Sequence, residues 1–394
     1  MLAPDRDPFD ERNKAQCAHP FIVACDLGGT TMDLAIVDAT GRIRFREQVA
    51  SPGRGGYTDR SRGQQTLDEV ARLLEAFIGA SAFPRGHLQA VGIGLPGITD
   101  PQGGLVSAAP ALGWWDTPVV RPLEDRLGLP IFIENDVNAA AVAEHLFGAG
   151  ARMRDFVFVA IGTGIGAGLV LQGELYRGHR YRAGEAGYLT VDREWVRGRI
   201  QAGHIRESFG CWESLASGTA VPRIAHQELP HMPAEVRAAW HGKPLTGRDV
   251  LSAAAAGDPL GLRTLDRLAE NLALGLTNII ALLDPEAIIL GGGIAQAGSL
   301  LVDAVVRWLD RTAPWTPPIL LSELGPNAGV LGAAAIALQA LQHRAPVPPG
   351  GDAGNSAQVA PDSLSGPLTA SQPSVTPLRE GLAGPRAHAS WRWS

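Results

Sequence analysis

The chain has 394 residues, 45% of them apolar, and a formal net charge of −6. This length is typical of two domains, and the negative charge argues against an extended nucleic-acid-binding surface. The three cysteines, Cys17, Cys25 and Cys211, are too few and too scattered for a disulfide framework, so a reducing, cytoplasmic compartment is expected. No apolar run reaches the length of a membrane span, and the acidic amino terminus lacks the order of a signal peptide.

Both ends of the chain are expected to be disordered. Residues 1–20 are polar and aperiodic, and residues 345–394 are dominated by Pro, Gly, Ser and Ala. Such compositions cannot offset the entropy of ordering. The favoured interpretation of the longer tail is a passive extension, and the alternative is a short docking element at Trp391 and Trp393.

The globular part opens with a strand, a turn and a second strand. The apolar run Phe21 to Cys25 precedes Asp26-Leu27-Gly28-Gly29-Thr30-Thr31, and the alternating stretch Met32 to Asp38 follows. Glycines let backbone N–H groups approach an anion closely, hydroxyls add hydrogen bonds, and Asp26 could hold a hydrated Mg²⁺ against phosphate. Taken alone, the pattern is equally typical of an ordinary β-hairpin.

An Asn-Asp pair lies at the next junction between a strand and a helix. Asn135 and Asp136 follow the apolar run Ile131 to Ile133 and precede a predicted helix from Asn138 to Phe147. Either side chain could cap the first free N–H groups of that helix. The alternative is that Asp136 is a general base, and the helix dipole would favour its ionised form.

A second glycine-rich turn is predicted about half the globular chain later. The apolar run Phe156 to Ala160 precedes Ile161-Gly162-Thr163-Gly164-Ile165-Gly166-Ala167-Gly168, and Leu169 to Leu171 then leads to a turn at Gln172-Gly173. Two such strand–turn–strand units facing each other would clamp a polyphosphate from both sides. There is no GxxxxGK[ST] sequence, which excludes a P-loop.

The other periodic segments alternate between helix and strand. They are the predicted helices 66–78, 260–283 and 329–341 and the predicted strands 90–94 and 287–290. The last strand leads into Gly291-Gly292-Gly293, which either permits close approach of a ligand or serves helix–sheet packing. The alternation, in two similar halves, predicts an α/β protein with two domains and a cleft between them.

Arginines are concentrated between residues 177 and 206. They are Arg177, Arg180, Arg182, Arg193, Arg197, Arg199 and Arg206. The favoured interpretation is a solvated face. The alternative is that some of them bind an anionic group of a substrate or of a phosphoryl donor.

Five further sequence motifs resemble those of a known family. They are GIGLPGITD (92–100), ENDVNAAAVAE (134–144), AGEAGY (183–188), GCWESLASG (210–218) and ILGGGIA (289–295). From about Phe21 to about Gln342 the chain resembles the ROK family of bacterial sugar kinases and sugar-responsive repressors. The resemblance implies the actin/hexokinase-type fold, with ribonuclease H-like domains at 21–136 and 137–344 around an interdomain active-site cleft. The last helix, at about 329–342, would pack back on the N-terminal domain.

The resemblance also implies an activity and its residues. A kinase of this family uses ATP and Mg²⁺, and Asp136 would take the proton from a primary hydroxyl of a hexose or hexose derivative. The sugar ligands would be Gly97, Asn135, Glu185, Tyr188 and Glu213, although glutamates in glycine-bounded loops are otherwise typical of solvated surface. Phosphates and metal would be held by Asp26, Gly28, Gly29, Thr30, Thr31, Gly162, Thr163 and Gly164, and adenosine by Gly292 and Gly293. A homodimer is usual among the relatives.

Some positions depart from the family pattern. Tyr188 stands where a histidine is typical, and Ala111 stands where a sugar-contacting asparagine is typical, so specificity for glucose does not carry over. Cys211 and His204 do not supply the four ligands of the family's structural zinc, so no such zinc is expected. Trp114 and Trp115 could offer an apolar face to the sugar or pack in the core.

The favoured function is therefore a sugar kinase that needs neither nucleic acid nor membrane. A sugar-sensing regulator is the first alternative, but the twenty residues ahead of Phe21 are too few for a winged helix-turn-helix. A catalytically inactive sugar-binding homologue is the second, and a kinase that uses polyphosphate in place of ATP is the third.

Overall fold

The structure is a computed structural model, and it describes residues 21–53, 62–202 and 210–343. The predictions of disorder at 1–20 and 345–394, including Trp391 and Trp393, lie outside the described residues. His204 and Arg206 lie outside them as well.

A first five-stranded sheet has the order β3-β2-β1-β4-β8. Its strands are β1 (Phe21–Leu27), β2 (Thr31–Asp38), β3 (Ile43–Ala50), β4 (Leu88–Leu95) and β8 (Ile131–Asn135). The pairs β1–β2 and β2–β3 are antiparallel, whereas β1–β4 and β4–β8 are parallel. Strand β1 is apolar on both faces, because Val23 and Cys25 pack on one side and Ile22 and Ala24 on the other.

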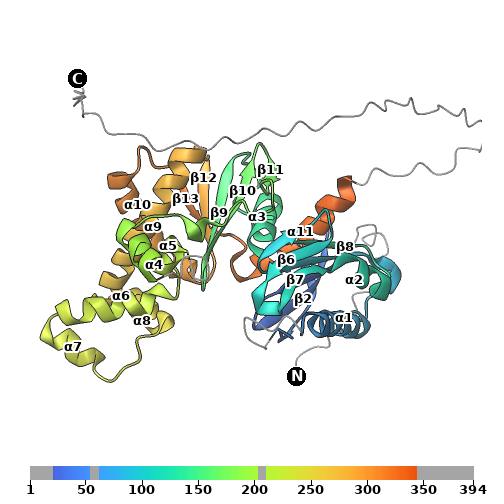
Figure 1. Ribbon diagram of the computed structural model, residues 1–394, viewed down its shortest axis with the longest axis horizontal. Coiled ribbons are helices and arrows are strands. Elements are labelled where there is room, and N and C mark those ends of the chain that lie inside the picture. The colour runs from blue at the N-terminus through green and yellow to red at the C-terminus, as the bar shows by residue number, and fades with distance from the viewer. Residues whose placement is uncertain (1–20, 54–61, 203–209, 344–394) are drawn as a thin grey trace, which may run out of the picture. The chain divides into compact units, whose positions relative to one another are not determined.

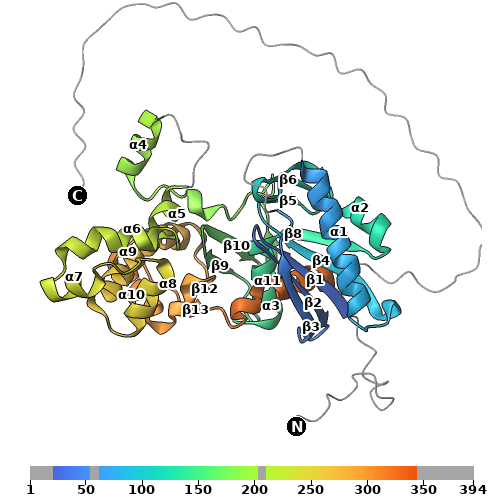
Figure 2. The same cartoon turned by 90° about the horizontal axis from the view of Figure 1, so that it is seen from below.

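Helices cover both faces of this sheet (Figure 2). On one face lie α1 (Gly63–Ala80) and α2 (Val120–Leu127), and on the other lie α3 (Asp136–Phe147) and α11 (Ala328–His343). A small antiparallel sheet, β5 (Ile98–Asp100), β6 (Leu105–Ala109) and β7 (Trp114–Pro118), extends from the end of β4. Short 3₁₀ helices, η3 (Arg85–His87) and η4 (Pro110–Leu112), complete this part.

A second five-stranded sheet repeats the same arrangement with the order β11-β10-β9-β12-β13. Its strands are β9 (Phe156–Ile161), β10 (Ile165–Leu171), β11 (Glu174–Tyr176), β12 (Ala287–Gly291) and β13 (Ile319–Leu321). Here too the first three strands are antiparallel and the last two are added in parallel. The two sheets are therefore topologically equivalent, and the turns after β1 and β9 occupy corresponding positions.

The helices that accompany the second sheet are α4 (Arg193–Ala202), α5 (Cys211–Ala216), α6 (Ala220–Glu228), α7 (Ala234–Trp240), α8 (Gly247–Ala255), α9 (Pro259–Leu283) and α10 (Ser299–Thr312), with the short 3₁₀ helices η5 (Ala186–Tyr188), η6 (Leu229–His231), η7 (Ile294–Ala297) and η8 (Gly325–Asn327). Of these, the apolar spacing predicted the long helix at 260–283, which corresponds to α9. Helix α9 ends at Asp284, a left-handed residue directly before Pro285. Within the described part of the chain, no helix combines the length and apolarity needed to cross a bilayer.

Helix α3 lies between the two sheets, beside α11 (Figures 1 and 2). Ala139 and Val142 pack with α11 and the first sheet, whereas Ala140 and Ala141 pack with Phe156 of the second. Small side chains on all sides let both neighbours approach closely. Asp136, at the start of α3, therefore lies where the two sheets meet.

One predicted element was wrong. The glycine turn expected over residues 161–168 is confined to residues 162–164, and Gly166 and Gly168 belong to β10. Both glycines face α3: a Cβ at Gly166 would lie 2.9 Å from Val137 Cγ2, and a Cβ at Gly168 would collide with Ala141 Cβ. These glycines therefore permit close helix–sheet packing and do not form a loop.

Candidate functional site

The turn between β1 and β2 is a tight hairpin, and a half-buried carboxylate, Asp26, lies just before it. The Gly28 N–H donates to the Thr31 carbonyl at 2.9 Å, and the N–H of Ser51, directly after β3, donates to the Thr30 carbonyl at 3.0 Å. Asp26 lies in β1, two residues before Gly28, with Asp33 opposite it on β2. Gly28, Gly29 and Thr30 therefore lie just beyond the strand end that presents Asp26.

Asn135 caps α3, and Asp136 is the first residue of that helix. Asn135 Oδ1 accepts hydrogen bonds from the Val137 N–H at 3.0 Å and the Asn138 N–H at 3.1 Å, and Asn135 Nδ2 donates to the Gly97 carbonyl at 3.0 Å. Asp136 Oδ1 accepts a further bond from the Val137 N–H at 2.9 Å. Because Asn135 performs the capping, Asp136 is not required for it.

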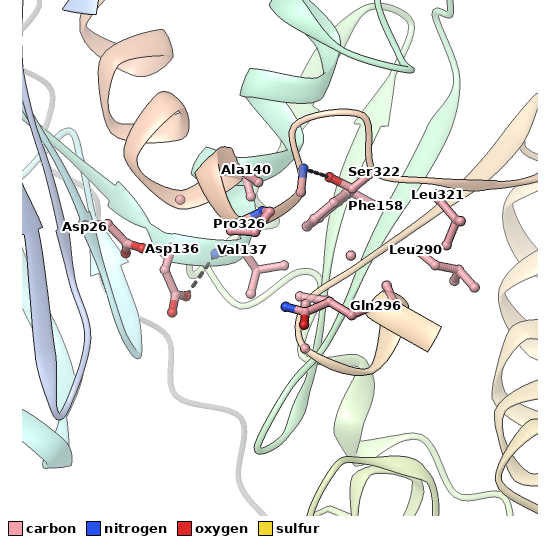
Figure 3. A pocket seen from close by; sticks show the side chains of 18 residues that line it. Asp26, Asp136, Val137, Ala140, Phe158, Leu290, Gln296, Leu321, Ser322 and Pro326 are labelled. Atoms are coloured by element: carbon pink, nitrogen blue, oxygen red, sulfur yellow. Dashed lines mark hydrogen bonds between the residues drawn. The ribbon is translucent and has the colours of Figure 1, made fainter. Parts of the chain in front are cut away.

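Asp26 and Asp136 line one cavity of about 420 Å³ (Figure 3). The opposite wall is formed by the end of β12 and by η7, including Gly291, Gly292, Gly293 and Gln296. Further lining comes from the stretch between the end of β13 and the start of α11, namely Leu321, Ser322, Gly325, Pro326, Ala328 and Gly329. The cavity therefore brings together residues from both sheets that are far apart in the sequence.

The two carboxyl groups have perturbed acidities. Burial, reinforced by the Asp136 and Asp33 carboxylates, raises the pKa of Asp26 to about 7. Burial raises the pKa of Asp136 to about 6, although the hydrogen bond from the Val137 N–H opposes that shift. Both shifts reflect the cost of holding charge in a desolvated site. A cation beside Asp26 would relieve that cost, so its carboxylate fits a hydrated Mg²⁺.

Asp26 also abuts the first turn of α11. A Cβ at Gly329 would collide with Asp26 Oδ2, so only glycine allows this approach. The free N–H groups at the start of a helix favour a negative charge. The Asp26 carboxylate therefore lies against the first turn of α11, at the edge of the cavity that both line.

The turn between β9 and β10 borders a second cavity of about 700 Å³. Its lining includes Gly162, Thr163, Thr219, Arg248, Ser252 and Ile294, and it shares Gly293 and Gln296 with the first cavity. The turn is fixed because the Gly218 N–H donates to the Gly162 carbonyl at 2.8 Å and the Thr219 hydroxyl donates to the Thr163 carbonyl at 3.3 Å. Sequence reasoning missed the α8 wall, since Arg248 and Ser252 belong to no pattern that signals a ligand.

Glu185, Tyr188 and Glu213 lie close enough for their charges to interact. Burial, followed by the Glu213 and Asp136 carboxylates, raises the pKa of Glu185. Burial also raises the pKa of Tyr188, a residue that is 58% exposed, and Glu213 and Glu185 add to that shift. Glu213 is fixed from both sides: its Oε1 accepts from the Gly210 N–H at 2.7 Å, and its Oε2 accepts from the Ile165 N–H at 3.2 Å.

For Trp114 the structure selects one of the two alternatives that the sequence left open. Trp114 is fully buried, and its Nε1 donates to the Gly63 carbonyl at 3.0 Å. It therefore packs in the core and offers no face to a sugar. Ala111 lies beside the turn between β1 and β2, where a Cβ added to Gly29 would be 3.3 Å from the Ala111 Cβ.

The arginine segment divides into two kinds of residue. Arg193 and Arg197 pair with exposed Glu194, and the Arg199 guanidinium lies 5.0 Å from the centre of the Trp195 ring. These α4 residues form the solvated face that the sequence favours. Arg177 differs, because it pairs with a buried carboxylate.

Metal ligands are not clustered in the described ranges 21–53, 62–202 and 210–343. In those ranges no three His, Cys, Asp or Glu side chains come together to hold an ion. Cys211 is buried, and its thiol lies 3.7 Å from the Asp192 carbonyl oxygen.

Comparison with known proteins identifies the family. The sequence model of the family described as "ROK family" matches residues 22–340 of the chain. The chain belongs to the ROK family. It is 34% identical to a glucokinase of Streptomyces coelicolor over 327 residues, which cover 80% of this chain and 96% of that protein. It is also 26% identical to a xylose repressor of Caldicellulosiruptor bescii, with 80% of this chain and 78% of the repressor covered.

A solved structure of a ROK relative matches the fold. It is a ROK family glucokinase from Streptomyces griseus in complex with glucose and AMPPNP, which is 33% identical. The match covers 81% of this chain and 99% of the relative, with a TM-score of 0.67. Together with the two equivalent sheets, it confirms the predicted family and the actin/hexokinase-like α/β fold of this ROK protein.

Proposed function

We propose that this ROK protein is an ATP-dependent kinase that phosphorylates a primary hydroxyl group of a hexose or hexose derivative. The observation that carries the proposal is the half-buried Asp136 carboxylate, which lines a cavity together with Asp26 while Asn135 caps the helix. The glucokinase relatives support the same reaction class. The repressor relative supports a second candidate, a regulator that binds sugar without turning it over.

The sugar would be bound by the residues around Asp136. Gly97 and Asn135 would form one wall, joined by their hydrogen bond of 3.0 Å. On the other side, Glu185 and Glu213 would accept hydrogen bonds from sugar hydroxyl groups, and the Tyr188 hydroxyl would donate or accept one. Asp136 would take the proton from the attacking hydroxyl, because a raised pKa of about 6 keeps it ionised at neutral pH and makes it a better base than a solvated carboxylate.

The phosphoryl donor would lie between the two glycine turns. Gly28, Gly29, Thr30 and Thr31 from one turn and Gly162, Thr163 and Gly164 from the other would hold phosphates by backbone N–H and hydroxyl groups. Adenosine would occupy the cavity of about 700 Å³, which Gly293 lines, with Gly292 beside it in the wall of the cavity of about 420 Å³. Asp26 would hold Mg²⁺ through water, and the metal would neutralise charge on the transferring group.

The remaining expectations become part of the proposal. We propose domain boundaries at 21–136 and 137–344, a homodimer, a cytoplasmic location and no structural zinc. Ala111 and Tyr188 argue for a sugar whose hydroxyl contacts differ from those of glucose in the relatives.

A screen of sugars tests the function. Purified protein is incubated with Mg²⁺ and ATP over common hexoses and amino sugars, and ADP release is measured, with the sugar phosphate identified by mass spectrometry. Turnover of at least one sugar is expected. Sugar binding by calorimetry without turnover would favour the regulator, and product formed only with polyphosphate would replace ATP as the donor.

A further inference from the structure

Arg177 forms an ion pair with a buried carboxylate, whereas Arg193 and Arg197 of the same segment pair with the exposed Glu194. Its Nε donates to Glu134 Oε2 at 2.6 Å, and the Glu134 side chain is only 2% exposed. A buried carboxylate is stabilised when it is paired and fully hydrogen-bonded, and it becomes costly when its partner is removed. The Arg177–Glu134 pair therefore has one buried partner, unlike the Arg197–Glu194 pair, in which both side chains are exposed.

Glu134 directly precedes the proposed sugar-binding and base residues. Its Oε1 accepts a hydrogen bond from the Asn135 N–H at 3.0 Å and another from Asn138 Nδ2 at 3.2 Å. One carboxylate therefore fixes the backbone of the capping residue and the first turn of α3. The position of Asp136 follows from the same first turn.

Arg177 belongs to the loop that leads to Glu185 and Tyr188. The loop begins after β11 and is closed by the Ala183 N–H, which donates to the Arg177 carbonyl at 3.1 Å. The Tyr181 hydroxyl donates to Gln102 Oε1 at 3.1 Å, in the turn between β5 and β6. The loop that follows β11 is thus attached at two points, to β8 of the first sheet through Glu134 and to the small sheet through Gln102.

We propose that Arg177 is a positioning residue of the phosphoryl transfer, acting through Glu134 to hold Asn135 and Asp136 in place relative to the sugar-binding loop. The inference rests on the proposed kinase function. Phosphoryl transfer needs the acceptor hydroxyl and the base aligned, and small displacements of such groups reduce turnover strongly.

Single variants at Arg177 test the role in turnover. Arg177→Gln is expected to lower kcat about 100-fold, the scale of a displacement of about 1 Å at a reacting group. KM for ATP should change less than about twofold, because the two glycine turns are untouched. Arg177→Lys should recover part of kcat, since it restores the charge without the guanidinium geometry. Arg180→Gln, a change in the same loop at an exposed residue, is the matched control and should behave as the unmodified protein.

A double variant separates action through Glu134 from direct contact with the substrate. In Glu134→Gln/Arg177→Gln the buried uncompensated charge is gone, so kcat and the thermal midpoint should both recover from the Arg177→Gln values, with kcat rising about tenfold. The inference is overturned if the double variant is as impaired as Arg177→Gln or worse, or if Arg177→Gln changes only KM for sugar.

The two proposals fail in distinguishable ways. An unmodified protein that phosphorylates no sugar overturns both. Normal turnover in Arg177→Gln, alongside an active unmodified protein, overturns only the positioning role.

Discussion

The side-chain amide of Asn135 donates a hydrogen bond to the carbonyl oxygen of Gly97 at 3.0 Å. The same side chain caps α3 through its oxygen. One residue thus fixes the Pro-Gly turn after β4, the start of α3 and, through that helix, the position of Asp136. A single amide links what sequence reasoning treats as separate motifs.

Replacing Asn135 by Ala should therefore cost both stability and sugar affinity. Loss of the cap is expected to lower the free energy of unfolding by about 1 kcal/mol. Loss of the link to Gly97 frees the pocket wall, so KM for the sugar should rise about tenfold or more, the effect of losing about 1.4 kcal/mol of binding. Urea denaturation and steady-state kinetics measure the two effects.

Asn278→Ala is the control for that change. Asn278 is exposed on α9 and its side chain donates to the Leu274 carbonyl of its own helix, so neither stability nor KM should move appreciably. Equal effects of the two substitutions would contradict the role assigned to Asn135.

Gly329→Ala should weaken the use of Mg²⁺. The new Cβ would collide with Asp26 Oδ2 and displace the carboxylate that we propose holds the metal through water. The Mg²⁺ concentration for half-maximal activity is expected to rise about tenfold or more, as for other changes behind a metal ligand. Gly79→Ala is the matched control, because a Cβ there would meet no atom within 4 Å. An unchanged Mg²⁺ requirement in Gly329→Ala would remove Asp26 from the proposed metal site.

Asp26 should make the stability of the metal-free protein depend on pH. Its pKa is about 7 in the folded protein against an ordinary 3.8, so the folded state holds a proton that the unfolded state releases. The free energy of unfolding should fall as pH rises from about 4 to about 7. Urea denaturation with chelator should show a smaller fall in Asp26→Asn, which cannot ionise. An identical pH dependence in both proteins would mean that Asp26 is not buried in this way.

Local patterns predicted the central strands of both sheets and the places of both glycine turns because those features depend on residues close in sequence. Runs such as Phe21 to Cys25 and Phe156 to Ala160 are apolar without interruption, and glycines or polar residues end them. The prediction for 161–168 was wrong because the glycines of β10 are needed for close packing against α3. That packing is a tertiary contact, which no local pattern reveals.

The site was predictable only in part for the same reason. Asp136 follows a strand and opens a helix, and this local context identifies it as a candidate. The pairing of Arg177 with Glu134, the burial of Trp114 and the α8 wall with Arg248 depend on segments far apart in the chain. No local pattern distinguishes Arg177 from its exposed neighbours.

Asp136→Asn is the sharpest test of the mechanism, because it removes the proton acceptor and keeps the size of the side chain. Turnover should fall by roughly two to four orders of magnitude, the usual range for loss of general-base assistance. The thermal midpoint should hardly fall, since Asn135 supplies the cap and a neutral amide avoids the cost of burying a charge.

The pH profile of the unmodified protein provides the companion measurement for Asp136. A base with a pKa of about 6 must lose its proton to act, so kcat/KM should be constant above that pH and fall in proportion to the ionised fraction below it. The residual activity of Asp136→Asn should lack this acid limb, because the amide does not titrate. Near-normal turnover in Asp136→Asn, or the same acid limb in both proteins, would remove Asp136 as the base and weaken the kinase assignment with it.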